Sequence, residues 1–485
     1  MAPEATNRQN NPWIAMAILC AGLFVTVLDT TIVNVAIPSI MSDLGAGLDE
    51  IMWVVSAYVL AVAVLIVTAG RLGDIVGPRT MFLIGLAVFT AGSLLCALAD
   101  SPALLITFRA VQGIGAALLT PQPMTLMMAM FPPEKRGVAG TVWGISAGVA
   151  AAVGPTLGGL LVTWQGWPWI FYINIPVGIL AFVLTLVFVP NLRTANRLSL
   201  DLVGVVLASL GFSAFTFGLL EGERYDWGTI SGFVSIPLVI AAGVALLAVF
   251  VFTQARARKN ALVPLSLFRM RNFSLASAAG LAISLGLTAM WVTLSIYMQS
   301  VLELSALQTG LALAPGALVM FPIFAVAGPI IDRTGGRWFL VSGLTIFAVA
   351  AAYVMLMARS ESSLWLMLPG VVLAGVGQAG VFAPMVAIAM FEVPESDMGA
   401  ASGAFNAIRQ AGFVIGAAVV GALLEGGVAA ARAEGMSMGE AFAEAMVPTM
   451  SVVVGVFVLV AAACLAVTRP DRPATADAGS AAVTA

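Results

Sequence analysis

An aspartate and an arginine lie inside two long apolar segments of the sequence. Asp29 is the one charged residue of LFVTVLDTTIVNVAIP (residues 23–38), and Arg109 lies within LLITFRAVQGIGAALLTP (residues 104–121). An apolar pocket favours the protonated form of a carboxyl group, whereas a neighbouring guanidinium or water favours the charged form. Such a pair could therefore bind and release a proton. The alternative is a permanent ion pair that only holds helices together.

The composition restricts which residues could carry that proton. The chain has no histidine, which is the usual proton carrier near neutral pH. Its two lysines, Lys135 and Lys259, lie outside the apolar segments, and Glu221 and Glu425 lie at the ends of such segments. Asp29 is therefore the acid that the sequence places best for proton exchange.

The overall composition is typical of a membrane protein. Of the 485 residues, 61% are hydrophobic and only 9% are charged, whereas soluble domains have about 25% charged residues. The net charge of −3 does not indicate a nucleic-acid partner. The three widely separated cysteines form neither a disulfide framework nor a CxxC metal site, so we expect no metal or other cofactor.

Fourteen segments are long and apolar enough to span a bilayer as helices of about 20 residues. They cover residues 14–37, 51–70, 80–99, 102–128, 138–163, 168–189, 201–220, 231–253, 273–298, 308–331, 337–357, 363–389, 399–424 and 448–467. The sequence therefore predicts an all-α polytopic membrane protein with 14 transmembrane helices.

Positively charged residues are divided unevenly between the two sides of these spans. If the N-terminus is cytoplasmic, the cytoplasmic segments hold sixteen Lys and Arg residues, and the outer loops hold only Arg224, Arg359 and Arg432. Cytoplasmic loops are enriched in these residues. We expect both termini in the cytoplasm, and the lysine-poor, Ala- and Gly-rich composition favours a bacterial plasma (inner) membrane.

Two cytoplasmic connections repeat one pattern, GRLGDIVGPR (residues 70–79) and GPIIDRTGGR (residues 328–337). The matching pairs are Gly70 and Gly328, Asp74 and Asp332, Gly77 and Gly335, and Arg79 and Arg337. Charged residues at a glycine-permitted turn can hold one helix end in one conformation and release it in another. An ordinary charged loop is the alternative. A repeat of this kind predicts two similar halves with a substrate site between them near the midplane.

The repeat defines the expected domain organisation. We expect a cytoplasmic N-terminus (residues 1–13), a six-helix bundle (14–190), two inserted spans with their linkers (191–260), a second six-helix bundle (261–468) and a disordered cytoplasmic tail (469–485).

Small residues and a proline mark another span, in GPTLGG (residues 154–159). Small residues four apart let helices approach closely, and proline bends a helix. Plain helix packing is one interpretation, and a role in the transport cycle is the other.

Five motifs, in order, carry a resemblance to a known family. They are LDTTIVNVAIP (28–38), GRLGDIVGPR (70–79), RAVQGIG (109–115), GPTLGG (154–159) and WPWIFYINIPVG (167–178). Together they resemble the major facilitator superfamily, and most closely its fourteen-helix drug:proton antiporters of the EmrB/QacA type. The resemblance covers nearly the whole chain, including the two inserted spans.

The resemblance implies roles for particular residues. It makes Asp29 and Arg109 the proton-coupling residues. The antiporter signature is carried by Gly154, Pro155, Gly158 and Gly159. The gating motif is carried by Gly70, Gly73, Asp74, Gly77 and Arg79, and by Asp332, Arg333, Gly335 and Arg337 in the second half.

The substrate cavity should be mostly apolar with a few polar groups. The candidates are Asn34, Tyr58, Gln112, Trp143, Asn174, Tyr297, Asn406 and Arg409. Arg409 lies close to the midplane of its span, where it either attracts anionic substrate groups or bonds to nearby carbonyls. The span 308–331 has no acid, although some polyspecific cation exporters of the family carry one there, which disfavours dicationic substrates.

The sequence thus predicts a transporter and not an enzyme. The first interpretation is a proton-coupled exporter of lipophilic drugs or antibiotics that works as a monomer in the lipid bilayer. The alternatives are a proton symporter that imports a nutrient or organic anion, and a non-transporting membrane sensor. No GxxxxGK[ST] loop is present, so the chain is not a self-contained ATP-driven pump.

Overall fold

The computed structural model describes residues 11–132, 135–191, 201–257, 261–304, 306–358 and 363–468. The first half contains α1 (Pro12–Leu44), α2 (Leu48–Val76), α3 (Pro78–Ala97), α4 (Pro102–Leu119), α5 (Gln122–Met130), α6 (Arg136–Gln165), α7 (Trp169–Tyr172) and α8 (Asn174–Phe188). The inserted region contains α9 (Leu202–Leu220), η3 (Glu223–Tyr225), the antiparallel strands β1 (Thr229–Ser231) and β2 (Val234–Ser235), and α10 (Ile236–Arg256).

The second half repeats the helical pattern of the first. It contains η4 (Leu265–Arg269), α11 (Arg271–Ser300), α12 (Ala306–Leu318), α13 (Met320–Thr334), α14 (Arg337–Met357), α15 (Leu364–Met390), η5 (Glu395–Asp397), α16 (Met398–Val419), the π-helical turn η6 (Val420–Glu425), α17 (Gly426–Ala433) and α18 (Met438–Cys464).

The prediction of an all-helical polytopic membrane protein is confirmed. Within the described ranges, 13 helices or joined helices are long and apolar enough to cross a membrane. The one remaining predicted span, the fifth (residues 138–163), falls inside α6, some of whose side chains lie outside the described set.

Several helices are longer than the sequence predicts, including α1 and the stretch that begins with α16. The helix α1 has 33 residues, which is about 50 Å at 1.5 Å per residue, whereas the hydrocarbon core of a bilayer is about 30 Å thick. The helix α16 continues through η6 into α17, so that the whole helical stretch runs from Met398 to Ala433. Hydropathy alone did not predict these extensions because they continue the helices beyond the apolar residues.

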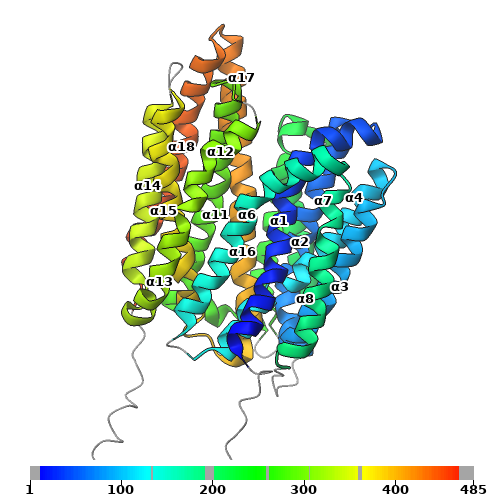
Figure 1. Cartoon of the computed structure of the whole chain (residues 1–485), viewed down its shortest axis with the longest axis vertical. Coiled ribbons are helices and arrows are strands. Elements are labelled where there is room, and N and C mark those ends of the chain that lie inside the picture. The colour runs from blue at the N-terminus through cyan, green and yellow to red at the C-terminus, as the bar shows by residue number, and fades with distance from the viewer. Residues whose placement is uncertain are drawn as a thin grey trace, which may run out of the picture.

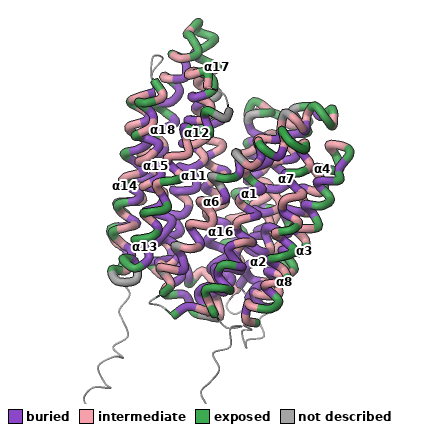
Figure 2. Tube along the Cα trace, viewed as in Figure 1, coloured by how far each residue is buried: buried purple, intermediate pink, exposed green. Residues whose placement is uncertain are grey.

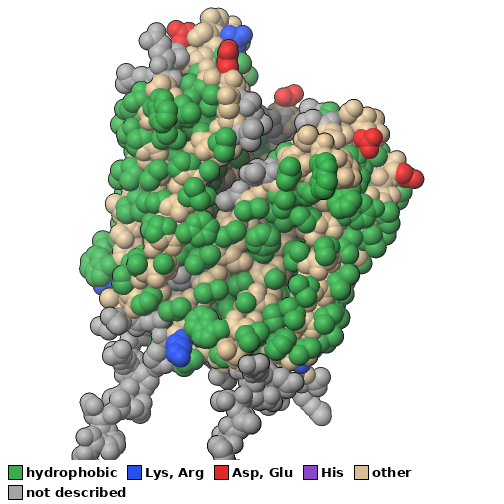
Figure 3. Space-filling model, in the orientation of Figure 1, with side chains coloured by type: hydrophobic (Ala, Val, Ile, Leu, Met, Phe, Trp, Pro, Cys, Tyr) green, Lys and Arg blue, Asp and Glu red, His purple; other side chains and the backbone are tan. Residues whose placement is uncertain are grey.

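The two halves form two bundles that meet at one end of the molecule and diverge toward the other (Figure 1). We call the end at which α1 begins and α18 ends the terminal end, and the end that carries α17 the far end. Across the seam, α2 packs on α16, and α6 packs on α13 and α15. Figure 3 shows a notch between the two halves at the far end.

The inserted helices α9 and α10 pack on each other at the edge of this seam. The helix α9 contacts both α2 of the first half and α16 of the second. The Ser209 hydroxyl on α9 donates a 3.2 Å hydrogen bond to the carbonyl of Val64 on α2. The insertion therefore lies against α2 and α16, which pack on each other across the seam.

The outer surface of the molecule is apolar over most of its height (Figure 3). Large side chains such as Trp164, Trp338 and Trp365 are 64–77% exposed, and tryptophans concentrate at the two interfaces of a membrane. Buried residues line the contacts between helices, while exposed residues gather on the outside and at the far end (Figure 2). This distribution fits a protein whose solvent is lipid around its middle.

Glycines set the separation of α3 and α4. A Cβ added at Gly115 would lie 2.6 Å from Phe89 Cα, and one added at Gly92 would lie 2.8 Å from Gln112 Cα. Close backbone approach through small residues is how membrane helices associate. This contact fixes the helix that carries Arg109 and Gln112.

We predict that Gly115→Ala lowers the melting temperature of the purified protein, because the added methyl group overlaps the Phe89 backbone. Overpacking of this kind costs about 1–3 kcal/mol. The matched control is Gly455→Ala on α18, where no described atom lies within 4 Å of an added Cβ, and where alanine favours the helix by up to about 1 kcal/mol. Equal effects of the two variants on thermal unfolding would contradict this packing.

Candidate functional site

Asp29 on α1 and Arg109 on α4 form an ion pair inside the first half. Arg109 Nη1 lies 2.5 Å from Asp29 Oδ2. Asp29 is 0% exposed and Arg109 is 1% exposed. Charges in such surroundings are stable only when they are paired and hydrogen-bonded, and the two residues supply each other's main partner.

Gln112 joins both members of the pair. Its Nε2 donates to Asp29 Oδ1 at 2.8 Å, and its Oε1 accepts from Arg109 Nη1 at 2.7 Å. Gln112 lies one turn after Arg109 on α4, so both side chains extend from the same face of one helix. Asn174, the first residue of α8, donates a longer bond of 3.2 Å to Asp29 Oδ1.

Arg109 has three further neighbours that do not depend on Asp29. Its Nε donates a 3.2 Å hydrogen bond to the carbonyl of Val54 on α2. Its guanidinium lies 4.3 Å from the centre of the Tyr58 ring and 5.7 Å from that of Phe171. A cation over an aromatic face is stabilised by the ring quadrupole, so the arginine is held from several sides.

The helix α3 supports this network from behind. Ser93 accepts a 3.0 Å hydrogen bond from Asn174 and donates one of 2.9 Å to the Phe171 carbonyl. The Cys96 thiol donates to Gln112 Oε1 at 3.6 Å. Neither Ser93 nor Cys96 could be identified as a site residue from the sequence, since a serine and a cysteine in an apolar helix carry no distinctive pattern.

The GPTLGG segment packs against α1 next to Asp29. A Cβ on Gly154 would overlap the side chain of Thr31, and one on Gly158 would lie 2.7 Å from Ile32 Cγ1. A Cβ on Gly159 would make an ordinary contact of 3.8 Å with Val35. The side chain of Pro155 lies outside the described set. Gly154 and Gly158 thus let α6 approach α1 within one turn of the carboxylate.

Asp74 links the two halves at the terminal end. Its carboxylate accepts hydrogen bonds from the backbone N–H groups of Gly399 at 2.7 Å and Ala400 at 2.9 Å, which belong to the first turn of α16. The first N–H groups of a helix have no partner inside the helix and carry partial positive charge. Arg71 lies 3.7 Å from the same carboxylate. Asp74 on the first half therefore caps a helix of the second half.

Small residues bring α2 and α16 together around that cap. A Cβ on Gly70 would overlap the facing backbone of α16, and one on Gly403 would lie 3.1 Å from the Val67 carbonyl oxygen. A Cβ on Gly73 would overlap Gln122 of α5. The Ser402 hydroxyl donates a 2.7 Å hydrogen bond to the Pro121 carbonyl. The terminal end is therefore closed between the halves.

The predicted gating segments are mostly helix and not loop. Residues 70–76 are the last turns of α2, and Gly77 alone separates α2 from α3, with φ of 105° that favours glycine. Arg79 donates to the Leu186 carbonyl at 2.5 Å, within the first half. In the second copy, Gly335 has φ of 80° and Arg337 lies over Trp338. The side chains of Asp332 and Arg333 lie outside the described set.

The sequence-family model described as Major Facilitator Superfamily matches residues 19–417 and, in a second match, residues 278–484. The chain belongs to this superfamily. The family consists of membrane transporters and not enzymes, and the resemblance drawn from the motifs is confirmed.

Relatives of this transporter include several proteins named as exporters. It is 35% identical over 476 residues to the cephamycin export protein CmcT of Amycolatopsis lactamdurans, covering 97% of this chain and 94% of that one. It is 35% identical over 404 residues to the multidrug resistance protein Stp of Mycobacterium tuberculosis, covering 83% of this chain and 74% of that one. The human organic anion transporter MFSD10 shares the fold at a TM-score of 0.66 and 16% identity, covering 93% of this chain and 99% of that one.

The structure divides the predicted cavity residues of this transporter into two groups. Tyr58, Gln112 and Asn174 surround the Asp29–Arg109 pair. The remaining candidates lie elsewhere, and Trp143 and Arg409 face each other across the two halves. Asn406 donates to the Ser402 carbonyl one turn earlier on α16, and Tyr297 packs edge-on against Phe442. The side chain of Asn34 lies outside the described set.

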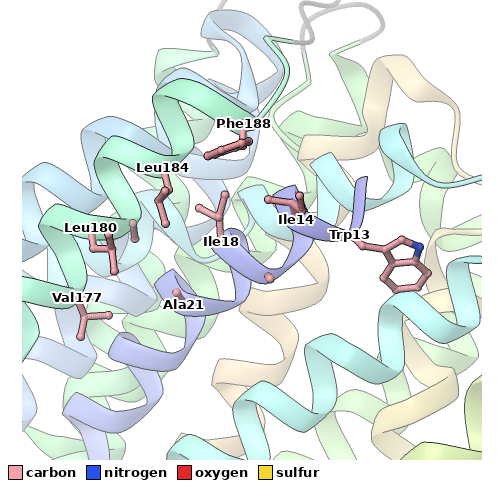
Figure 4. Close-up of a pocket in the computed structure, with 10 residues that line it drawn as sticks. Trp13, Ile14, Ile18, Ala21, Val177, Leu180, Leu184 and Phe188 are labelled. Atoms are coloured by element: carbon pink, nitrogen blue, oxygen red, sulfur yellow. The ribbon is translucent and has the colours of Figure 1, made fainter. Parts of the chain in front are cut away.

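An apolar groove of about 480 Å³ lies between α1 and α8 (Figure 4). Ile14, Ile18, Leu184 and Phe188 line it together with other apolar side chains, and Trp13 lies at its rim. The residues that line it carry no charge. Its apolar walls match the chemistry of a lipid chain.

We predict that Arg109→Gln destabilises the transporter strongly, because it leaves a buried carboxylate without its counter-charge. Breaking a buried pair in this way costs about 3–5 kcal/mol. Adding Asp29→Asn should recover part of that loss, since the double variant buries no charge at this position. The measurement is the melting temperature of the purified single and double variants. Strictly additive losses would contradict the coupling of the two residues.

We predict that Asp74→Ala loosens the closed terminal end, because α16 loses two hydrogen bonds to a charged acceptor. Bonds of this kind contribute about 1.5–3 kcal/mol each. The fraction of molecules whose terminal end is open between the halves should therefore rise about tenfold or more. The reporter is Val67→Cys, a position on α2 that is 3% exposed, in a background without the native cysteines. Its rate of reaction with a maleimide should increase by a similar factor.

Asp43→Ala is the matched control for this experiment. Asp43 on α1 accepts a 2.7 Å hydrogen bond from Trp167 Nε1, and both residues belong to the first half. The maleimide rate should therefore stay at the wild-type value in this variant. Equal rates in Asp74→Ala and wild type would show that the cap does not hold the halves together.

Proposed function

We propose that this transporter exports lipophilic small molecules, with drugs or antibiotics among them, in exchange for protons. The observation that carries the proposal is the fully buried Asp29–Arg109 pair with Gln112 and Asn174 around it. An ionisable pair inside a membrane-spanning bundle is costly, and proton relays in transporters are built from such groups. Asp29 is the proton carrier, and Arg109 controls its charge.

The surroundings of the pair are suited to both protonation states. When Asp29 is charged, it accepts from Arg109, Gln112 and Asn174. When it is protonated, Arg109 keeps its bonds to the Gln112 amide oxygen and the Val54 carbonyl, and it keeps the Tyr58 ring. Both states therefore leave the guanidinium with partners, which lowers the cost of switching.

A protonated Asp29 also needs an acceptor for its new O–H group. Asn174 Oδ1 is buried and has no hydrogen-bond partner among the described residues. The Asn174 Nδ2 lies 3.2 Å from Asp29 Oδ1. Rotation of the amide by half a turn would therefore bring Oδ1 of Asn174 to that position. The amide can thus donate to the carboxylate and accept from the carboxylic acid.

The helix α6 supplies a physical connection between proton exchange and movement of the halves. Its second part packs on α1 beside Asp29 through Gly154 and Gly158. Its first part packs on α13 and α15 of the other half. A change of charge at Asp29 that shifts α1 would therefore also move α6 against α13 and α15, as alternating access requires.

The direction of transport is part of the proposal. We place the terminal end on the cytoplasmic side of a bacterial plasma membrane, because Lys and Arg concentrate in the segments at that end. The closed terminal end and the notch at the far end then correspond to an outward-facing state. Export, rather than import by a symporter, is supported by relatives whose names include export, such as the tetracenomycin C resistance and export protein of Streptomyces glaucescens, 32% identical over 423 residues.

The test uses everted membrane vesicles with an acidified lumen. A panel of lipophilic antibiotics and dyes is added, and the pH gradient is followed with a fluorescent amine. A substrate should dissipate the gradient with wild type, and Asp29→Asn should abolish that response at equal amounts of inserted protein. Asp43→Asn, which changes another hydrogen-bonded carboxylate on the same helix, should leave it intact. Dissipation by Asp29→Asn at the wild-type rate would contradict the proposed carrier.

A further inference from the structure

Arg409 lies between aromatic rings from both halves of the transporter. Its guanidinium is 5.6 Å from the centre of the Trp143 ring on α6 and 5.3 Å from that of Phe382 on α15. A Cβ at Gly280 on α11 would lie only 3.0 Å from Arg409 Cγ, so the glycine leaves room for the aliphatic part of the arginine side chain. Arg409 is eleven residues beyond the start of α16, or about 16 Å into the helix.

The guanidinium of Arg409 has no anionic or oxygen partner among the described residues. None of the ion pairs in the described part of the chain includes it. Its Nε is buried without a hydrogen bond, and the Trp143 indole Nε1 is buried without one as well. The Arg409 Nε–H and the Trp143 indole N–H are therefore two buried donors without an acceptor among the described residues.

Three other arginines of the described chain have oxygen acceptors. Arg79 bonds to the Leu186 carbonyl, and Arg136 bonds to the carbonyls of Phe131 and Met128. Arg109 has a carboxylate, an amide oxygen and a carbonyl. Arg409 lies deeper in its helix than Arg79 or Arg136 do in theirs, yet it has only ring faces. A cation at that depth is costly unless something else supplies the negative charge.

We propose that Arg409, Trp143 and Phe382 form a substrate subsite for an anionic group, a carboxylate or a sulfonate, that is attached to an aromatic body. The guanidinium binds the anion, the Trp143 N–H donates a second hydrogen bond, and the rings of Trp143 and Phe382 contact the aromatic part. This assignment rests on the proposed export function, since it names the substrate class of that transporter.

The subsite also joins the halves. Trp143 belongs to the first half, whereas Phe382 and Arg409 belong to the second. A ligand held by all three bridges the seam between α6 and the pair α15 and α16. The subsite is therefore complete only while α6 lies against the second half, so the affinity for the anion depends on the conformation of the transporter.

The test compares two fluorescent probes that differ only in the anionic group. These are 8-anilino-1-naphthalenesulfonate and N-phenyl-1-naphthylamine, which lacks the sulfonate. Each is titrated against the purified full chain in lipid nanodiscs, with empty nanodiscs subtracted. The sulfonated probe should bind wild type saturably. Arg409→Gln should weaken its binding about tenfold or more, as expected for loss of a charge-assisted hydrogen bond, and should change binding of the uncharged probe less than twofold.

Two further variants separate the parts of the subsite. Trp143→Phe keeps a ring but removes the N–H, and should weaken binding of the sulfonated probe about tenfold, because a hydrogen bond to an anionic acceptor contributes about 1.5–3 kcal/mol. Arg256→Gln is the matched control, because Arg256 also lies over a phenylalanine ring, 4.1 Å from Phe252 at the end of α10. It should leave both affinities unchanged.

Three results would overturn the subsite. They are unchanged binding of the sulfonated probe in Arg409→Gln, an equal loss of both probes in that variant, and no saturable binding of the sulfonated probe by wild type. The binding assay needs no proton gradient, so it fails independently of the vesicle assay with Asp29→Asn. Selective loss in Arg409→Gln without proton exchange would leave the subsite standing and remove the exporter proposal.

Discussion

A charge inside an apolar bundle needs a partner, and the partners of four charged side chains, in three arrangements, organise this transporter. Asp29 and Arg109 are satisfied by each other and by amides within the first half. Asp74 is satisfied across the halves, by backbone N–H groups that begin α16. Arg409 has only aromatic faces among the described residues. The first arrangement is internal, the second joins the halves in one conformation, and the third leaves a position for a ligand.

Close helix packing makes these partnerships possible. The carboxylate of Asp74 reaches α16 because Gly70, Gly399 and Gly403 let the two backbones meet. Arg109 and Gln112 are held in place by the glycine contacts between α3 and α4. In the membrane, packing and polar contacts carry much of the association energy, because lipid is as apolar as the helices themselves. The same small residues that stabilise one conformation also allow the halves to separate without deep interdigitation of large side chains.

Much of the architecture follows from hydropathy and residue counting. The spans, the repeat and the family resemblance could be predicted from the sequence, and so could the position of Asp29 and Arg109 inside two of the spans. The rotation of each helix about its axis could not be predicted from one sequence. For that reason the sequence did not predict that Tyr58, Gln112 and Asn174, which were expected in the cavity, contact the ion pair. The partners of Asp74 are more than 300 residues away along the chain, and no local pattern identifies such a contact.

The central claim is that Asp29 exchanges its proton as substrate binds. The most direct test is proton release in solution: purified transporter in weakly buffered detergent receives a compound that dissipates the vesicle gradient, and an indicator dye records the pH change. We expect wild type to release protons in proportion to the compound bound, and Asp29→Asn to bind the same compound without release. Equal release by the two proteins would place the proton on another group and leave Asp29 and Arg109 as a structural ion pair.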